Sequence, residues 1–256
     1  MGRNDLCFCM SGKKNKNCHP NIHVESCAAV KLNIYGQLDK DLKEHRQGVN
    51  FNSLCTAGCS DCCYDYFTIQ SIEFHLILNE LTKWDKDKVN KLIERVERYW
   101  NTLEADQPEA IKLLLRATCK DIEEINSSVV RTSFPCVFLD EDTHLCQIYD
   151  YRPFKCRIFG TTYYCDQSQP PIGIACDKYN SVLNYNNFDT MLFDITELYK
   201  KNDGLSVIGI CEYPLIYFLH QHFVVKKLGV SIVNFYENFK HPSSYVYNLI
   251  KSNIQR

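Results

Sequence analysis

Cysteine is the feature that most constrains this chain, because thiols in large numbers need metal ions, disulfide partners or a buried environment. The 256 residues include 15 cysteines, about 6%, which is below the 8–10% typical of short disulfide scaffolds. The first twenty residues lack the apolar run of a secretory signal, so we expect a reducing, cytoplasmic location. Cysteines in such a compartment point to metal or redox chemistry more than to structural disulfides.

The first group of candidate ligands lies near the N-terminus, with the spacing C-x-C-x8-C-H. The four candidates are Cys7, Cys9, Cys18 and His19. Three thiolates and one imidazole can complete the tetrahedral shell of a structural zinc ion. Gly12 permits a tight turn between the two ligand pairs. So short a segment buries too little surface to fold alone, so zinc would supply most of its folding energy. We therefore expect a zinc knuckle over residues 1–22.

Residues 2–19 resemble the SEC-C motif, the zinc knuckle at the C-terminus of the SecA translocation ATPase and in other bacterial proteins. The matching residues are Gly2, Arg3, Asn4, Asp5, both ligand pairs and Ser11 to Lys14. Leu6, Phe8 and Met10 stand where the motif usually has Pro, Pro and Gly. The resemblance implies a protein partner such as the ribosome or the secretion factor SecB. The basic face suited to an acidic partner would consist of Arg3, Lys13, Lys14 and Lys16.

A second group of cysteines occupies the stretch "CTAGCSDCC" and consists of Cys55, Cys59, Cys62 and Cys63. A predicted helix over residues 71–84 follows it, with Ser71 as the candidate cap and Glu73 in the first turn. The positive end of a helix dipole and its N–H groups stabilise nearby thiolate charge. Metal ligands just before this helix are therefore plausible on electrostatic grounds.

A third group of cysteines, Cys136, Cys146 and Cys156, is spaced ten residues apart. The sequence "FLDEDTHLCQIY" predicts two short strands around a turn, which would bring Cys136 and Cys146 together across a hairpin. Cationic residues surround the last of the three thiols, namely Arg152, Lys155 and Arg157. Four thiolates on a divalent ion carry a net charge of about −2, which such groups offset.

Together the second and third groups resemble the YkgJ-type cysteine-cluster family, proteins with a proposed zinc- or iron-chelating role. The family block C-x-I-Y-x-x-R-P-x-x-C-R is matched in full by residues 146–157, and the resemblance is strongest over residues 50–180. It implies a metal centre, and the flagellin lysine N-methylase relatives favour an iron–sulfur cluster. Those relatives are much longer, so the resemblance does not imply the same reaction.

The central region offers more thiols than one metal centre needs, since a zinc ion or a cubane cluster takes four. One centre with spare thiols and a two-metal site both stay open. The favoured ligands are Cys59, Cys62, Cys63, Cys136, Cys146 and Cys156, followed by Cys55 and then Cys176. Adjacent cysteines cannot both point the same way on a regular element, so either Cys62 or Cys63 would serve a second metal or only pack.

Helical periodicity dominates the rest of the chain. The predicted helices cover residues 28–46, 86–105, 108–126, 188–203 and 244–253. The apolar run 205–225 contains Glu212, Pro214 and two histidines, so we expect a buried helix or strand there and no membrane span. The predicted fold is α+β and mostly helical, with short strands and loops around a cysteine-ligated metal centre. Residues 1–22 would form the knuckle and residues 23–256 the metal-binding domain.

The sequence leaves the reaction open. It has no nucleotide-binding glycine loop and no nucleophile elbow, and its net charge of −2 gives no case for DNA or anionic membranes. One hypothesis is an iron–sulfur or iron enzyme that acts on a peptide or protein by redox chemistry or side-chain modification. The alternatives are a non-catalytic, zinc-stabilised adaptor of the ribosome or secretion machinery, and a metal chaperone.

Overall fold

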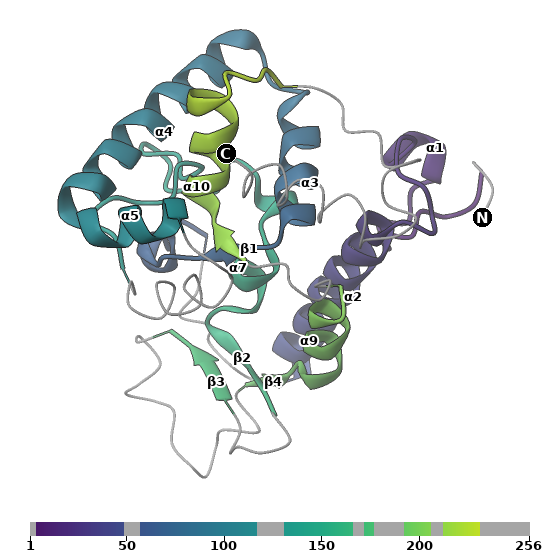
Figure 1. Ribbon diagram of the computed structural model, residues 1–256. Helices are drawn as coiled ribbons and strands as arrows, with labels where there is room; N and C mark the ends of the chain where they lie inside the picture. Colours follow the sequence, from purple (N-terminus) through teal and green to yellow (C-terminus); the bar gives the residue numbers. More distant parts are fainter. Residues whose placement is uncertain are drawn as a thin grey trace. The chain divides into compact units, whose positions relative to one another are not determined.

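A computed structural model describes residues 4–48, 57–116, 131–165, 172–176, 192–205 and 212–230 (Figure 1). Each of the two compact units of the chain combines stretches that are distant in sequence. Unit 1 takes in the described residues up to Ala57 and those from Phe154 to 205. Unit 2 takes in the described residues from Gly58 to Pro153 and 212–230. Both are mostly helical with a few short strands, which confirms the predicted α+β class.

Unit 1 is organised around α2 (Cys27–Gly48), the helix predicted over 28–46. Its other helices are α1 (Asn15–Cys18), α7 (Phe154–Ile158) and α9 (Thr196–Asp203). Its strands are β2 (Thr161–Tyr164), β3 (Ile172–Ala175) and β4 (Phe193–Asp194). They form a sheet of order β3-β2-β4, in which β2 pairs antiparallel with β3 and parallel with β4.

Two buried cations attach helices of unit 1 to α2. The Lys31 ammonium is fully buried and donates a hydrogen bond of 2.5 Å to Asn202 Oδ1 on α9. The Arg157 guanidinium of α7 pairs with Asp39 at 2.5 Å and lies over the Tyr35 ring at 4.1 Å. Burying a charged group is costly unless it is paired and hydrogen-bonded, so these partners are needed. The charge of Arg157 is thus engaged by a carboxylate on α2.

Unit 2 contains the longer run of helices: α3 (Ser71–Leu81), α4 (Lys86–Asp106), α5 (Pro108–Arg116) and α10 (Leu215–Leu219). Shorter elements are the 3₁₀ turns η1 (Asp61–Tyr64) and η2 (Tyr149–Tyr151) and the π-helix η4 (His220–Val225). Strands β1 (Thr68–Ile69) and β5 (Tyr213–Pro214) pair antiparallel. The apolar run predicted as helix or strand therefore contains one short strand followed by a helix.

The core of unit 2 lies between α3, α4 and α10. The helix predicted over 86–105 is α4, and its apolar residues Leu92, Val96 and Trp100, which repeat at helical spacing, are all buried. On α5, which covers the described start of the helix predicted over 108–126, Ile111 and Leu114 are buried and Leu115 is 53% exposed. This short helix packs against α4 along one narrow line of side chains, so its remaining leucines face outward.

The start of α3 differs from the prediction. The cap is Gln70 rather than Ser71, because Gln70 and Glu73 form a reciprocal capping box. The Glu73 carboxylate accepts a hydrogen bond of 2.8 Å from the Gln70 backbone N–H. Such a box satisfies two backbone donors at once, which a single serine hydroxyl cannot do.

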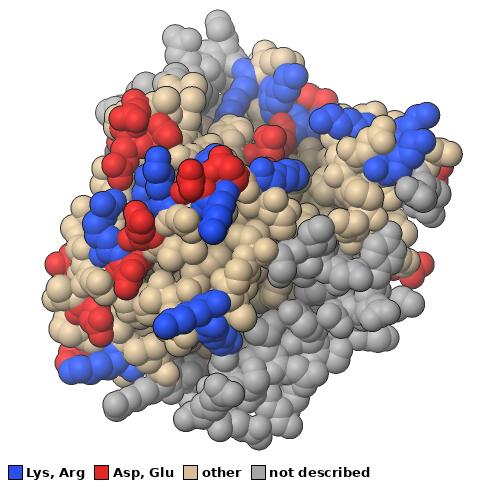
Figure 2. All heavy atoms as spheres, turned by 90° about the horizontal axis from the view of Figure 1, so that it is seen from above, with Lys and Arg blue, Asp and Glu red and all other residues tan. Residues whose placement is uncertain are grey.

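Charged side chains of both signs are intermixed on the face of the molecule that Figure 2 displays. This agrees with the net charge of −2. Among the described residues, no helix combines the length and the apolar character needed to cross a bilayer.

Candidate metal centres

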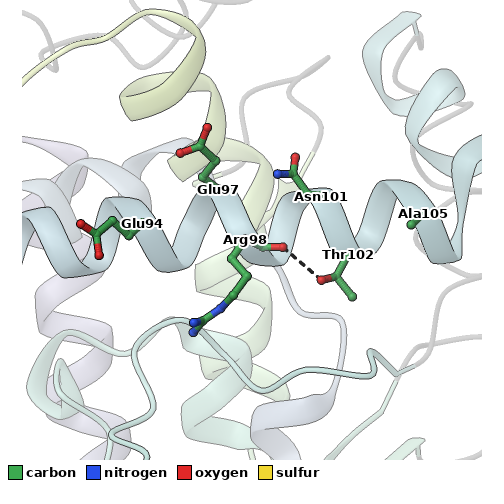
Figure 3. Close-up of a pocket in the computed structure, with 6 residues that line it drawn as sticks. All are labelled: Glu94, Glu97, Arg98, Asn101, Thr102 and Ala105. Carbon is green, nitrogen blue, oxygen red and sulfur yellow. Dashed lines mark hydrogen bonds between the residues drawn. The ribbon is translucent and has the colours of Figure 1, made fainter.

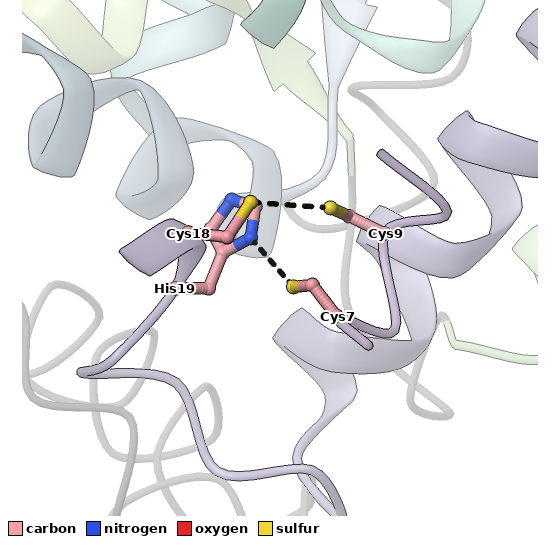
Figure 4. A group of neighbouring side chains, drawn as sticks. All are labelled: Cys7, Cys9, Cys18 and His19. Carbon is pink, nitrogen blue, oxygen red and sulfur yellow. Dashed lines mark hydrogen bonds between the residues drawn. The ribbon is translucent and has the colours of Figure 1, made fainter. Parts of the chain in front are cut away.

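The N-terminal ligand candidates converge on one point of unit 1 (Figure 4). The four ligand atoms of Cys7, Cys9, Cys18 and His19 all lie within 4.8 Å of one another. Cys7 Sγ is 3.2 Å from His19 Nδ1, and Cys9 Sγ is 3.5 Å from Cys18 Sγ. Ligands about 2.3 Å from a tetrahedral zinc ion would lie about 3.8 Å apart. The donor set and its spacing therefore fit a small tetrahedral ion.

Local backbone geometry builds this N-terminal centre. The Cys7 N–H donates to the Lys13 carbonyl at 2.8 Å and closes the loop between the two ligand pairs. Gly12 has a φ of 74°, which confirms the predicted glycine turn. Met10 also has a positive φ, 62°, in a region that is unfavourable for a side chain with a Cβ. A glycine, the usual residue of the SEC-C motif at this position, would adopt it without strain.

The thiols of the N-terminal centre differ in acidity. Burial raises the pKa of Cys7 to about 12. Burial would also raise the pKa of Cys9, but hydrogen bonds from His19 and Ser11 outweigh it and lower the pKa to about 6. The Ser11 hydroxyl lies 3.2 Å from Cys9 Sγ and 3.3 Å from Cys18 Sγ. A metal ion entering this group must therefore displace a tightly held proton from Cys7.

In unit 2 the segments that carry Cys63 and Cys136 are held side by side by backbone hydrogen bonds. The Cys136 N–H donates to the Cys63 carbonyl at 2.6 Å, and the Thr132 N–H donates to the Tyr64 carbonyl at 2.8 Å. The Arg131 side chain reinforces this junction through the Asp61 carbonyl (3.0 Å) and the Asp65 carboxylate (3.5 Å). Segments about 70 residues apart in sequence therefore meet at Cys63 and Cys136.

The predicted turn between Cys136 and Cys146 is present, but a single bridge closes it in place of the two predicted strands, and Leu139 rather than Cys136 lies opposite Cys146. Leu139 and Cys146 form an antiparallel bridge, and the Gln147 N–H donates to the Phe138 carbonyl at 2.8 Å. Asp140 organises the turn, because its carboxylate accepts hydrogen bonds from the backbone N–H and hydroxyl of Thr143. These bonds lower the pKa of Asp140 to about 2.

The pKa values of two central thiols are shifted in part by other thiols. A hydrogen bond with Cys63, followed by burial, raises the pKa of Cys62 far above its usual range. Burial raises the pKa of Cys136 to about 12, and the charges of Cys146 and Cys62 add to the effect. Thiols that share one region cannot all ionise unless a cation offsets their charge. The N-terminal group is nevertheless the only one among the described residues whose ligand atoms converge as closely as a metal shell requires.

The other predicted ligands are distributed over both units. Cys59 precedes η1 in unit 2. Cys156 lies on α7 and Cys176 follows β3, so both belong to unit 1. Cys55 lies outside the described residues. The twelve described cysteines are all thiols.

Arg95 is a site residue that the sequence analysis missed. From α4 its Nη1 donates to two carbonyls of the cysteine hairpin, Val137 O and Leu139 O, each at 2.9 Å. Its Nε lies 3.9 Å from the Glu141 carboxylate, and its charge counteracts part of the rise in the pKa of Cys136. The one signal in the sequence is its position at the border of the apolar stripe of α4, where a long side chain can reach a neighbouring segment.

A surface hollow of about 650 Å³ lies along one face of α4 (Figure 3). It is lined by Glu94, Glu97, Arg98, Asn101, Thr102 and Ala105. The Thr102 hydroxyl donates to the Arg98 carbonyl at 3.0 Å, as is common within a helix. The lining comes from successive turns of a single helix and includes no thiol, so this hollow is separate from both cysteine groups.

A mostly helical chain that joins thiol-bearing segments distant in sequence, and that also carries a group of three cysteines and one histidine, is typical of a cysteine-cluster metal-chelating protein. The model of the CxxCxxCC family, described as "Putative zinc- or iron-chelating domain", matches residues 54–186. This is just over half of the 256 residues, and the chain belongs to this family. Searches of curated proteins and of solved structures find no significant match.

Proposed function

We propose that the N-terminal centre is a structural zinc site of the SEC-C type. The observation that carries this proposal is the closed donor set of three thiols and one imidazole within 4.8 Å. Four protein ligands leave no open position for a substrate, which is typical of structural zinc. When bound, the ion would supply cross-linking energy to a segment of few apolar residues.

The central thiols would hold the second metal, either an iron–sulfur cluster or a zinc or iron ion. The proposed ligands are Cys59, Cys62, Cys63, Cys136, Cys146 and Cys156, with Cys55 and Cys176 in reserve. The family match, the backbone junction between Cys63 and Cys136 and the YkgJ-type block at 146–157 support this assignment. Arg95 would hold the hairpin and offset part of the thiolate charge.

The proposed chemistry is redox chemistry or side-chain modification of a peptide or protein in the cytoplasm. Its support is the excess of central thiols over the four that one metal needs. The second candidate is a non-catalytic adaptor that binds the ribosome or a secretion factor, or a metal chaperone. The exposed Lys13, Lys14 and Lys16 of the knuckle favour the adaptor.

Elemental analysis of protein purified without oxygen, together with its visible spectrum, tests the proposal. About one zinc per chain, with iron, acid-labile sulfide and a broad brown absorption, is the result expected for a cluster protein. Two or more zinc ions per chain, in a protein without visible absorption, would favour the second candidate function, the zinc-stabilised adaptor. Absence of bound metal after anaerobic purification would contradict both.

A further inference from the structure

The N-terminal ligand loop is buried to a degree that its own few residues do not explain. Cys7, Phe8 and His19 are 4%, 8% and 8% exposed. The Phe8 ring stacks on the His19 imidazole, with centroids 5.6 Å apart. A segment of this length exposes most of its surface when it stands alone. Another element of unit 1 must therefore cover it.

Helix α2 is in contact with the ligand loop at two positions on one face. The Asn33 side-chain amide donates a hydrogen bond of 2.8 Å to the carbonyl of Phe8, the residue between two ligands. One turn later, Gly36 lies against the backbone of Cys9 and the Cβ of Met10. Residues three apart share a helix face, so the two contacts belong to a single surface.

The contact at Gly36 requires the absence of a side chain. A Cβ at this position would lie 2.3 Å from the Cys9 carbonyl oxygen, 2.9 Å from its carbonyl carbon and 3.1 Å from Met10 Cβ. The first two are backbone atoms, which cannot move without moving the ligand itself. Glycine in the middle of a 22-residue helix is otherwise unfavourable relative to alanine. The close approach to Cys9 gives a reason for it.

We propose that Asn33 and Gly36 are positioning residues of the N-terminal metal centre, so that α2 sets the geometry of the Cys7–Cys9 loop. The inference rests on the proposed metal site and adds that two residues outside the knuckle help to position its ligands. Asn33 fixes the carbonyl between the two thiols, and Gly36 lets the second thiol's backbone approach the helix. Metal affinity at the knuckle would then depend on a helix that contributes no ligand.

The test uses the full chain loaded with Co²⁺ under reducing conditions, because thiolate–Co²⁺ bands in the visible spectrum report ligand geometry. Subtracting the spectrum of Cys9→Ser isolates the N-terminal centre from other thiols. Gly36→Ala should weaken Co²⁺ binding at this centre at least tenfold in competition with a chelator, and shift its bands. Asn33→Ala should weaken it about fivefold, the effect of one lost hydrogen bond.

Two matched variants on α2 serve as controls. Gly48→Ala makes the same substitution at a position where no atom of the described residues lies within 4 Å of the new Cβ. Gln37→Ala removes an amide that donates to Asp41 instead of to the knuckle. Both should keep the affinity and the spectrum of the unmodified chain.

The results separate the inference from the proposed metal site. If the unmodified chain gives no Co²⁺ spectrum that depends on Cys9, the metal site itself is wrong. If it does, but Asn33→Ala and Gly36→Ala bind Co²⁺ within twofold of the controls and with unshifted bands, the inference alone is overturned. Circular dichroism checks folding, and Asn33→Ala decides the question if Gly36→Ala does not fold.

Discussion

At the scale of single residues, Arg95 shows how a side chain that is not a ligand can govern a thiol group. Its Nη1 donates hydrogen bonds to the carbonyls of Val137 and Leu139, which follow Cys136 in the hairpin. The same charge opposes the effect of burial on the pKa of that thiol. Residues that orient metal ligands often affect metal binding 10- to 100-fold.

We therefore expect Arg95→Met to release the central metal about tenfold more readily to a chelator, as measured by metal content after graded competition. Arg98→Met is the matched control, because Arg98 lies on the same helix and approaches Glu141 at 3.7 Å without bonding the hairpin carbonyls. Equal metal retention by the two variants would contradict the role of Arg95.

His75 provides a pH-dependent contribution to stability. Its Nδ1–H donates to the Ser71 carbonyl at 2.7 Å, and burial lowers its pKa to about 4. Between about pH 6.5 and 4 the His75 imidazole is protonated in the unfolded chain but stays neutral in the folded one. The free energy of unfolding therefore falls as the pH decreases through this range. The full effect is about 3 kcal/mol.

His75→Gln should accordingly flatten the pH dependence of stability, measured by urea unfolding at several values between pH 7 and 4. The unmodified chain carries the same metal ligands, so metal loss at low pH affects both proteins and cancels in the comparison. Parallel pH profiles would show that His75 does not carry this effect.

At the scale of elements, α4 is the support on which the central hairpin is held. Its first turn is capped by Asp85, whose carboxylate accepts a hydrogen bond of 2.8 Å from the Lys88 N–H. Arg95, Arg98 and Tyr99, further along the helix, all approach Glu141 of the hairpin. The helix that carries these contacts is thus stabilised at its start by the Asp85 cap.

Asp85→Ala should lower the free energy of unfolding of the chain by about 1 kcal/mol, since it removes a side-chain cap. Asp85→Asn keeps an oxygen acceptor and should be close to neutral. Chemical denaturation followed by circular dichroism measures both. A similar loss in the two variants would indicate that charge, rather than the cap, is what matters.

Local patterns predict much of this fold because they act over a few residues. Apolar periodicity predicts α2 and α4 to within two residues at each end, and the turn sequence predicts the hairpin at Asp140. Ligand spacing predicts the convergence of the N-terminal donors. The parallel pairing of β2 with β4, the π-helix η4 and the junction of Cys63 with Cys136 depend on partners distant in sequence. No local pattern encodes such contacts. The close approach of Gly36 to the backbone of Cys9 is likewise not visible in the sequence.

At the scale of the whole molecule, the proposed centres draw on separate thiol groups. The knuckle ligands belong to unit 1. Five of the six favoured central ligands, Cys59, Cys62, Cys63, Cys136 and Cys146, belong to unit 2; the sixth, Cys156, belongs to unit 1 but is not among the residues whose ligand atoms converge at the knuckle. We therefore expect the loss of one metal to leave the other in place.

Cys9→Ser should reduce the zinc content by about one ion per chain and keep the central metal, because four ligands are needed for a structural ion. Cys136→Ser should do the reverse, and Cys27→Ser is the control at a cysteine outside both proposed ligand sets. Metal analysis of the three variants decides the matter. Simultaneous loss of both metals from either ligand variant would contradict separate centres.

Unit 1 combines segments from the start and from the second half of the chain, which affects how it can fold during synthesis. Helix α2 ends at Gly48, but α7 and α9, which pack on it, begin at Phe154 and Thr196. At synthesis rates of about 5–20 residues per second, α2 waits roughly 5–30 s for these partners. Among the described residues of unit 1, the knuckle precedes α2 in the sequence and is already complete when α2 has been made. Early metal capture would then protect a nascent amphipathic helix until its later partners emerge.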